Sequence, residues 1–304
     1  MADNRGLTDA DVVAYMEKLS NWGRWGAEDQ RGALNYLTPA KRASAAGLVR
    51  SGEVVATSLR LPVAPGPNNP RPVLHFMLGT GENAESTGST DFFGLAYHGR
   101  TISHIDALCH IFWQGKMYNG FPASEVRPDG AHKNAIHGVR EDVSGRGVLL
   151  DIPPIRGREW LEPGDPVYVE DLEAAERAQG ARVEEGAILL VRTGRWHPGR
   201  PQTGPSDPLA GLHASTLPWL YERRVAALGG DGVNDVSPSG FASIRLPIHT
   251  VTIVAMGIHL LDNQDLEPLS AACQRLGRYE FFYVVAPLYL ERGTGSPATG
   301  LAFF

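Results

Sequence analysis

Short apolar runs bounded by glycine and proline recur along this chain of 304 residues and limit the folds that it can adopt. The sequence contains 35 glycines and 22 prolines, about a fifth of the chain against an average of about 12%. Several runs do not alternate between apolar and polar residues, which is typical of strands buried on both faces. These runs cover residues 148–152, 188–191, 225–228 and 281–285. The pattern predicts an α/β fold and excludes a helical bundle.

Capping residues and apolar spacing predict three helices. The first covers residues 9–20, where Thr8 can cap the helix together with Asp11. Thr38 and Pro39 open the second, with Gly52 after its expected end, and the third covers about residues 171–179 and stops at Gly180. Residues 247–256 are expected to form a buried helix that leads into a strand at 258–261. We therefore predict an N-terminal helical extension over residues 1–52 and a single α/β domain over residues 53–304.

Charge and cysteine content exclude several classes of protein. The formal charge is −6 and the pI is about 5.9, which argues against a nucleic-acid binder because such proteins carry a basic stripe. Two cysteines, Cys109 and Cys273, exclude a disulfide framework and indicate a reducing compartment. The N-terminus lacks the basic-then-apolar pattern of a secretory signal, and no apolar run reaches the ~20 residues of a membrane span. We expect a cytoplasmic protein that acts on a small molecule and binds neither nucleic acid nor membrane.

Three of the ten histidines fall within residues 98–110, and an aspartate lies among them. On a strand, residues i and i+2 point the same way, so His104 and Asp106 can present an imidazole and a carboxylate to one point. This pairing is typical of a mononuclear site for Zn²⁺, Mn²⁺ or Fe²⁺. His98 shares their parity, but six residues of straight strand span ~20 Å. It can join them only if residues 99–103 bend the chain back, whereas His110 fits a helical turn after the strand.

A lone His-x-Asp is more often a surface feature or a hydrogen bond in the core. Here Ile105, Ala107 and Leu108 indicate burial, and a buried imidazole and carboxylate need partners that a metal supplies. Farther along the chain His249 and Asp262 form a second candidate pair, although each could also be a core histidine or a turn residue. The other histidines have no partner at ligand spacing and are interpreted as structural or surface residues: His75, His132, His137, His197, His213 and His259.

The stretch Ser-His-Ile-Asp-Ala-Leu-Cys-His at 103–110, continued by residues 115–120, resembles the signature of the cyclase-like metal-dependent hydrolases. That family includes bacterial kynurenine formamidase, isatin hydrolase and proteins named as polyketide cyclases. Residues 246–249, 261–266 and 286–297 are similar to its C-terminal signature, and residues 22–26 and 32–35 match its longer branch. The resemblance implies a swivelling β/β/α fold, a dimer or higher homo-oligomer, and a Zn²⁺ or Mn²⁺ site that opens amide or lactam bonds.

The resemblance also implies roles for single residues. His104, Asp106 and His110 match the motif directly, and Asp262 stands where smaller members have a glutamate. In the family, the first metal histidine lies four residues before the second. Here the second is His104, and the position four residues before it holds Arg100. Because an arginine cannot ligate a cation, His98 is the natural substitute. The predicted metal ligands are thus His98, His104, Asp106 and Asp262. His110 is the predicted general base or proton shuttle, and His249 with Asp262 holds a second metal or orients water and the leaving group.

We therefore predict a metal-dependent hydrolase that uses activated water to open a non-peptide C–N bond of a small cyclic or aryl amide. One alternative is a lactone hydrolase of the same family. Another is a non-haem iron oxygenase that uses His104, Asp106 and His249, although residues 250–261 lack the Lys or Arg that 2-oxoglutarate enzymes need. A third is a non-catalytic ligand-binding relative, suggested by Arg100. Candidate walls for an aromatic substrate are Trp22, Trp25, Phe112 and Trp113, although at least half of them are expected to pack in the core instead.

Overall fold

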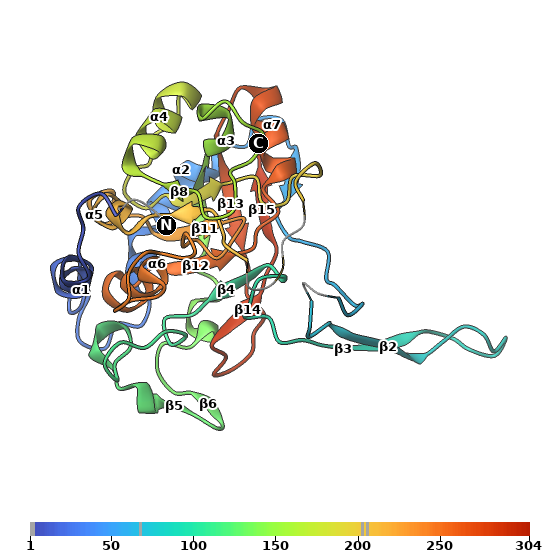
Figure 1. Ribbon diagram of the computed structural model, residues 1–304. Helices are drawn as coiled ribbons and strands as arrows, with labels where there is room; N and C mark the ends of the chain where they lie inside the picture. The colour runs from blue at the N-terminus through green and yellow to red at the C-terminus, as the bar shows by residue number, and fades with distance from the viewer. Residues whose placement is uncertain (1–3, 67–68, 202–203, 205–206) are drawn as a thin grey trace.

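The computed structural model describes residues 4–66, 69–201, 204 and 207–304. A mixed sheet of nine strands runs through this part of the chain (Figure 1). In spatial order its strands are β1 (Val54–Ala56), β15 (Gly300–Phe303), β13 (Glu280–Val285), β7 (Ser144–Asp151), β9 (Ile188–Arg192), β11 (Ala227–Gly230), β12 (His259–Asp262), β4 (His104–Asp106) and β14 (Gly295–Pro297). The four strands β7, β9, β11 and β12 are parallel, and antiparallel strands flank them on both sides.

Helices cover the sheet and connect its strands. The α-helices are α1 (Asp9–Lys18), α2 (Pro39–Ala46), α3 (Ile152–Ile155), α4 (Val169–Gln179), α5 (Leu217–Glu222), α6 (Pro247–His249) and α7 (Glu267–Leu276). A π-helix, η6 (Thr250–Met256), continues directly from α6. Short 3₁₀ turns lie at η1 (Gly32–Tyr36), η2 (Tyr118–Gly120), η3 (Ala123–Glu125), η4 (Ile136–Val139) and η5 (Ala214–Thr216). None of the described helices has both the length and the apolar character needed to cross a membrane.

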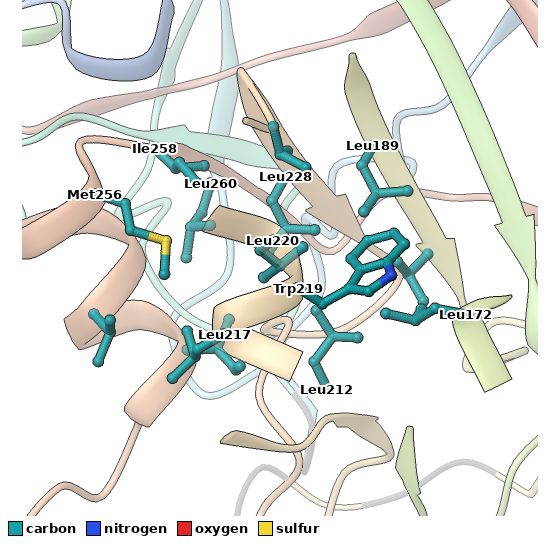
Figure 2. Close-up of a cluster of buried hydrophobic side chains, with 14 of the residues drawn as sticks. Leu172, Leu189, Leu212, Leu217, Trp219, Leu220, Leu228, Met256, Ile258 and Leu260 are labelled. Carbon is teal, nitrogen blue, oxygen red and sulfur yellow. The ribbon is translucent and has the colours of Figure 1, made fainter. Parts of the chain in front are cut away.

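The central strands are buried on both faces, as their non-alternating sequences predict. Val148, Leu189 and Leu260 pack on one face with α4, α5 and η6, whereas Leu149 and Leu190 pack on the other face with α7. Figure 2 shows part of the first core, in which the indole of Trp219 lies between side chains of the sheet and of α4. The four predicted strands are all present, with ends shifted by up to four residues.

The predicted helices form, with two differences. Thr8 and Asp11 make a reciprocal capping box at the start of α1, and Gly180 ends α4 in a left-handed conformation. Helix α2 begins at Pro39 but ends at Ala46, well before Gly52, because Gly47 already caps it and the chain continues as turns. The buried helix at 247–256 is mostly a π-helix. The predicted division of the chain at residue 52 stays a prediction.

A small two-stranded hairpin projects from the body of the molecule (Figure 1). It consists of β2 (Leu74–Gly79) and β3 (Thr90–Gly94), and most of its side chains are exposed. The sequence does not predict this hairpin. Two shorter pairs complete the described strands: β8 (Pro166–Val167) pairs with β10 (Gly211–Leu212), and β5 (Val126–Arg127) pairs with β6 (Gly130–Ala131).

The N-terminal segment is tied to the C-terminal end of the π-helix. The Asn21 side chain and the Trp22 indole donate to the carbonyl oxygens of Met256 and Val254, at 2.8 and 2.6 Å. Ala33 N donates to Gly257 O at 2.7 Å. Gly32, with φ of +59°, comes so close that a Cβ there would lie 2.1 Å from Gly257 O. Since η6 continues from α6, this segment supports the helix that carries His249.

This close approach predicts different effects for two glycine substitutions. Gly52 also has positive φ, at +75°, but a Cβ there would meet nothing within 4 Å. Gly52→Ala should lower the free energy of unfolding by about 1–2 kcal/mol, the cost of a left-handed L-residue. Gly32→Ala should lower the free energy of unfolding by a further ~1–3 kcal/mol, because its methyl group meets the backbone of Gly257, which cannot move aside. Urea unfolding measures both values, and equal losses would show that the contact with Gly257 does not constrain the fold.

Candidate metal centre

Strand β4 carries the His-x-Asp pair, and both side chains point to the same side of the sheet. Their exposed fractions are 1% for His104 and 0% for Asp106, while Ile105 between them packs into the core on the opposite side. His104 Nε2 lies 3.4 Å from Asp106 Oδ1. The Nδ1–H of His104 donates to the Ile102 carbonyl at 2.7 Å, so Nε2 is the nitrogen that faces the carboxylate. The structure thus brings these two side chains together, and their role as metal ligands stays a prediction.

Asp262 reaches the same point across the sheet ladder. It is the last residue of β12 and stands directly opposite His104 in the antiparallel pairing with β4. Directly opposed residues place their side chains on one face about 5 Å apart, and His104 Nε2 lies 4.0 Å from Asp262 Oδ2. The side chain of Asn234 donates to Asp262 Oδ1 at 2.7 Å, which leaves Oδ2 directed at the histidines.

The chain before β4 bends back, so His98 joins this group. His98 Nδ1 lies 3.0 Å from Asp106 Oδ1. Asn263 holds the bend, because its side-chain NH₂ donates to the carbonyl oxygens of Gly99 and Ile102 at 2.8 and 3.2 Å. The hydroxyl of Thr294 lies 3.0 Å from the other ring nitrogen of His98. Asn263 and Thr294 were not predicted, since their contacts join segments more than 160 residues apart.

His110 stacks on His98, with ring centroids 3.8 Å apart and planes 4° from parallel. Its Nε2 lies 3.9 Å from Asp106 Oδ1. Burial lowers the pKa of His110 to about 4, so its imidazole is neutral near pH 7. A neutral imidazole at this distance suits both a general base and a ligand.

His249 is the last residue of α6, and Asp235 fixes its side chain. The Asp235 carboxylate accepts hydrogen bonds from Ile248 N, His249 N and His249 Nδ1 at 2.7, 3.0 and 2.6 Å. The ring therefore presents Nε2, which lies 3.3 Å from Asp262 Oδ2 and 3.6 Å from Asp106 Oδ2. Asp235 was not predicted either. A carboxylate behind an imidazole is the usual outer support of a metal-binding histidine.

The electrostatics of the site fit a cation. Burial opposes ionisation of Asp106, but the surrounding imidazoles, chiefly that of His104, hold the pKa of Asp106 well below its usual range. Despite its own burial, His104 has a pKa raised to about 9, chiefly by Asp106. Burial also lowers the pKa of His249, but Asp262 and Asp235 outweigh this effect and raise the pKa well above its usual value. These carboxylates hold positive charge at the imidazoles, and a metal ion would take the place of the imidazole protons.

Several buried polar atoms of the site have no hydrogen-bond partner among the described residues. Both carboxylate oxygens of Asp106 and Nδ1 of His98 are buried without a hydrogen bond to any described residue, although 3.0 Å separates Nδ1 from Oδ1. Two atoms this close without hydrogen-bond geometry are arranged as ligands of one ion would be. Two overlapping groups place their ligand atoms within 4.8 Å of one another, and both contain Asp106: His98, Asp106 and His110, and His104, Asp106 and Asp262.

The centre opens into a cavity of about 740 Å³. His104, His110, His249 and Asp262 line one side. The remaining walls come from Gly99, Arg100, Ile111, Val233, residues 237–242, Arg245 and Leu246. The aromatic side chain in this wall is Phe241.

The four aromatic residues predicted as pocket walls do not line this cavity, which corrects that expectation. Trp22 is bound to the end of η6, and Trp25 makes an edge contact with Tyr36 at 5.0 Å. Phe112 is 45% exposed, and Trp113 pairs with Lys116 in a short bridge. Their segments cover the outside of the molecule. Of the histidines interpreted as structural or surface residues, none lines the cavity either.

Comparisons with known proteins agree with this geometry. The family model described as "Putative cyclase" matches residues 57–234. A crystal structure described as a novel cyclase is 31% identical, with a TM-score of 0.86 over 95% of this chain and 99% of that chain. No curated protein sequence matches this chain significantly.

More distant solved structures share the fold. Isatin hydrolase A from Labrenzia aggregata, bound to benzyl benzoate, is 18% identical, with a TM-score of 0.58 over 86% of this chain and 96% of that chain. A predicted metal-dependent hydrolase from Bacillus stearothermophilus is 15% identical, with a TM-score of 0.50 over 82% of this chain and 97% of that chain. The predicted α/β fold of the cyclase-like hydrolases is confirmed. The extent of the family match and the 31% identical structure together place this chain in the cyclase family.

Proposed function

We propose that this protein is a metal-dependent hydrolase that opens the C–N bond of a small cyclic or aryl amide. The observation that carries the proposal is a cluster of six side chains, the buried carboxylate of Asp106 and five others around it, at the wall of a cavity large enough for a small organic molecule. Four of them are the proposed ligands of a divalent ion: His98, His104, Asp106 and Asp262. Imidazole mixed with carboxylate suits Zn²⁺ or Mn²⁺.

A divalent ion at this position supplies a Lewis acid that polarises a carbonyl and lowers the pKa of water. The protein's own groups would do the remaining work. His110 faces the cavity as a neutral imidazole, so it can accept the proton of the attacking water and return it to the leaving nitrogen. His249 is held by Asp235 and is proposed to orient the water and the leaving group. Ile111 and Phe241 would contact the apolar part of the substrate.

The same geometry keeps a second candidate open. His104, Asp106 and His249 also meet, with ring nitrogens 3.4 and 3.6 Å from the Asp106 oxygens, and two histidines with one carboxylate form the iron site of many oxygenases. Elemental analysis of the purified protein separates these proposals. Zinc or manganese near one per chain supports hydrolysis, and iron supports oxygenation. Failure to bind any of them supports a non-catalytic relative. A panel of cyclic amides, formanilides and lactones then separates amide from lactone hydrolysis.

Removal of the central carboxylate should remove the metal. In Asp106→Ala the histidines lose the negative charge that makes the site attract a cation, so both metal content and turnover should fall to background while the circular dichroism spectrum is retained. A suitable control is Asp129→Ala, because Asp129 also faces a histidine, His132, at 3.0 Å but lies on the surface. Full metal occupancy in Asp106→Ala would show that this carboxylate is not a ligand.

Substitution of His110 separates a base from a ligand. If His110 moves protons, His110→Ala should reduce kcat about 10²–10⁴-fold, while KM changes little and metal content stays that of the unmodified protein. Loss of the metal from this variant would instead make His110 a ligand and would direct the search for the base to His249. An unchanged kcat would assign the residue a structural role.

We also propose that the protein forms a homodimer or higher homo-oligomer through the β2–β3 hairpin. One face of the hairpin is apolar: Phe76 and Phe92 stand directly opposite each other with rings stacked at 5.0 Å, and Leu74 and Leu78 flank them. All four side chains are at least 43% exposed. An isolated hairpin is marginally stable in water, and exposed apolar patches are typical of interaction sites.

The same chain carries a recess that suits this face. An apolar groove of about 370 Å³ near the base of the hairpin is lined by Leu59, Leu61, Phe93, Ala286, Leu288 and Ala298, among others. Two copies related by a two-fold axis could therefore exchange hairpins, each apolar face covering the groove of the other copy. A second copy of this chain is the occupant that we propose.

Polar substitutions on the apolar face should weaken the assembly. The double variant Phe76→Ser/Phe92→Ser should run as a monomer in light scattering at concentrations where the unmodified protein is oligomeric. The matched control is His75→Ser/Asp91→Ser, because this pair lies on the other face of the hairpin, 2.9 Å apart. A monomeric unmodified protein, or an oligomer in both variants, would contradict the proposal.

A further inference from the structure

We infer that the substrate carries a carboxylate, which Arg100 and Arg245 bind at the wall of the same cavity. The inference deepens the proposed hydrolase function and rests on it. The two arginines line the same cavity as His104, His249 and Asp262. The cavity thus combines a carboxylate-rich end, which suits a cation, with a guanidinium-lined wall.

Arg100 is partly buried and Arg245 is exposed, and neither forms an ion pair within the described part of the chain. No carboxylate of the described residues forms an ion pair with Arg100 or Arg245, whereas most other arginines in this part of the protein are paired. Arg100 is half-buried, and the hydrogen bond found for its guanidinium goes to a backbone carbonyl, Asp207 O at 2.7 Å. Burial and the positive charge of Arg245 lower the pKa of Arg100, whereas the negative charge of Asp207 raises it, so the two guanidinium groups repel each other. An anion between them would relieve this repulsion.

Further positive charge lies behind Arg100, where Asp231 is near Arg195 but forms no ion pair with it. Arg195 donates to the backbone oxygen of Arg100 at 2.9 Å, and Arg200 donates to the backbone oxygen of Arg195. Arg200 is buried and Arg195 is partly buried, and Nη1 of Arg195 has no hydrogen-bond partner among the described residues. Burying charge without a counter-charge is costly, so this wall is organised for a ligand rather than for stability.

The carboxylates of the metal centre do not neutralise the two arginines of the cavity wall once a divalent ion is bound. A divalent ion at the centre would be balanced by Asp106 and Asp262, and Asp235 is hydrogen-bonded to His249. The charges of Arg100 and Arg245 then remain. A guanidinium presents paired N–H donors that match the two oxygens of a carboxylate. Ile111 and Phe241, in the same cavity wall, suit the hydrocarbon body between the carboxylate and the scissile amide.

Paired substrates test this inference within the proposed reaction. Formanilide and its ring-carboxylated derivatives contain the same scissile bond and differ by one negative charge. The unmodified protein should show a kcat/KM at least tenfold higher for a carboxylated member, since a hydrogen bond to a charged group is typically worth a factor of about 10–100. Arg100→Gln and Arg245→Gln should each reduce that ratio toward one. Arg177→Gln, on the exposed surface of α4, removes the same charge and should leave the ratio unchanged.

Equilibrium binding gives a second readout that does not require turnover. In isothermal titration the protein should bind benzoate more tightly than benzamide, its neutral counterpart, and the difference should shrink about tenfold or more in Arg100→Gln and Arg245→Gln but not in Arg177→Gln. Because benzoate could also bind the metal, the titration is repeated after chelation, where the arginine dependence should persist. Metal content is measured in every variant.

The two experiments distinguish the possible failures. Equal turnover of neutral and carboxylated formanilides would overturn the inference and leave the hydrolase proposal intact. No turnover of any amide, combined with arginine-dependent binding of benzoate, would overturn the hydrolase proposal and keep the anion site. Benzoate binding that disappears on chelation and ignores both arginine substitutions would show that the carboxylate meets only the metal.

Discussion

The burial of one carboxylate is the constraint on which the rest of the site depends. Asp106 has no exposed surface, and a buried charge is tolerated only when opposite charge surrounds it. The protein meets this requirement by bringing histidines from the turn before β4, from β4 itself, from the turn after it and from α6 to the same two oxygens. Any element that moved away would leave an unpaired charge in the core, so the fold and the centre stabilise each other.

The sheet provides the geometry that makes this convergence possible. Parallel strands end at one edge of a sheet, and polar side chains gather beyond their carboxyl ends. β12 ends there with Asp262, and β4 pairs antiparallel to it, so that β4 begins where β12 ends. A histidine at the start of one strand and an aspartate at the end of the next are thus placed face to face by backbone hydrogen bonds alone. Asn234 and Asp235, in the loop after β11, then fix Asp262 and His249.

How much of the site could be predicted from the sequence depends on how far apart in the chain the interacting residues lie. The positions of His104 and Asp106 follow from strand parity, a local property that the sequence displays. The bend that returns His98 depends on Asn263, and the orientation of His249 depends on Asp235, so sequence spacing left both open. Trp22 and Trp25 were misplaced because aromatic character does not say which surface a residue covers. The hairpin was missed because its strands lack the buried pattern that marked the others.

The arginine wall also depends on how one aspartate is used. Asp231 follows β11, is fully buried and lies near Arg195, so it could have formed the missing ion pair. Its two oxygens instead accept hydrogen bonds from the backbone nitrogens of residues 193–195 and from the Thr193 hydroxyl. The carboxylate fixes the path of the loop that carries Arg195 and forms no ion pair with its guanidinium. Charge that the chain could have neutralised internally is therefore kept free beside the cavity, which is the arrangement expected where an anionic ligand completes the site.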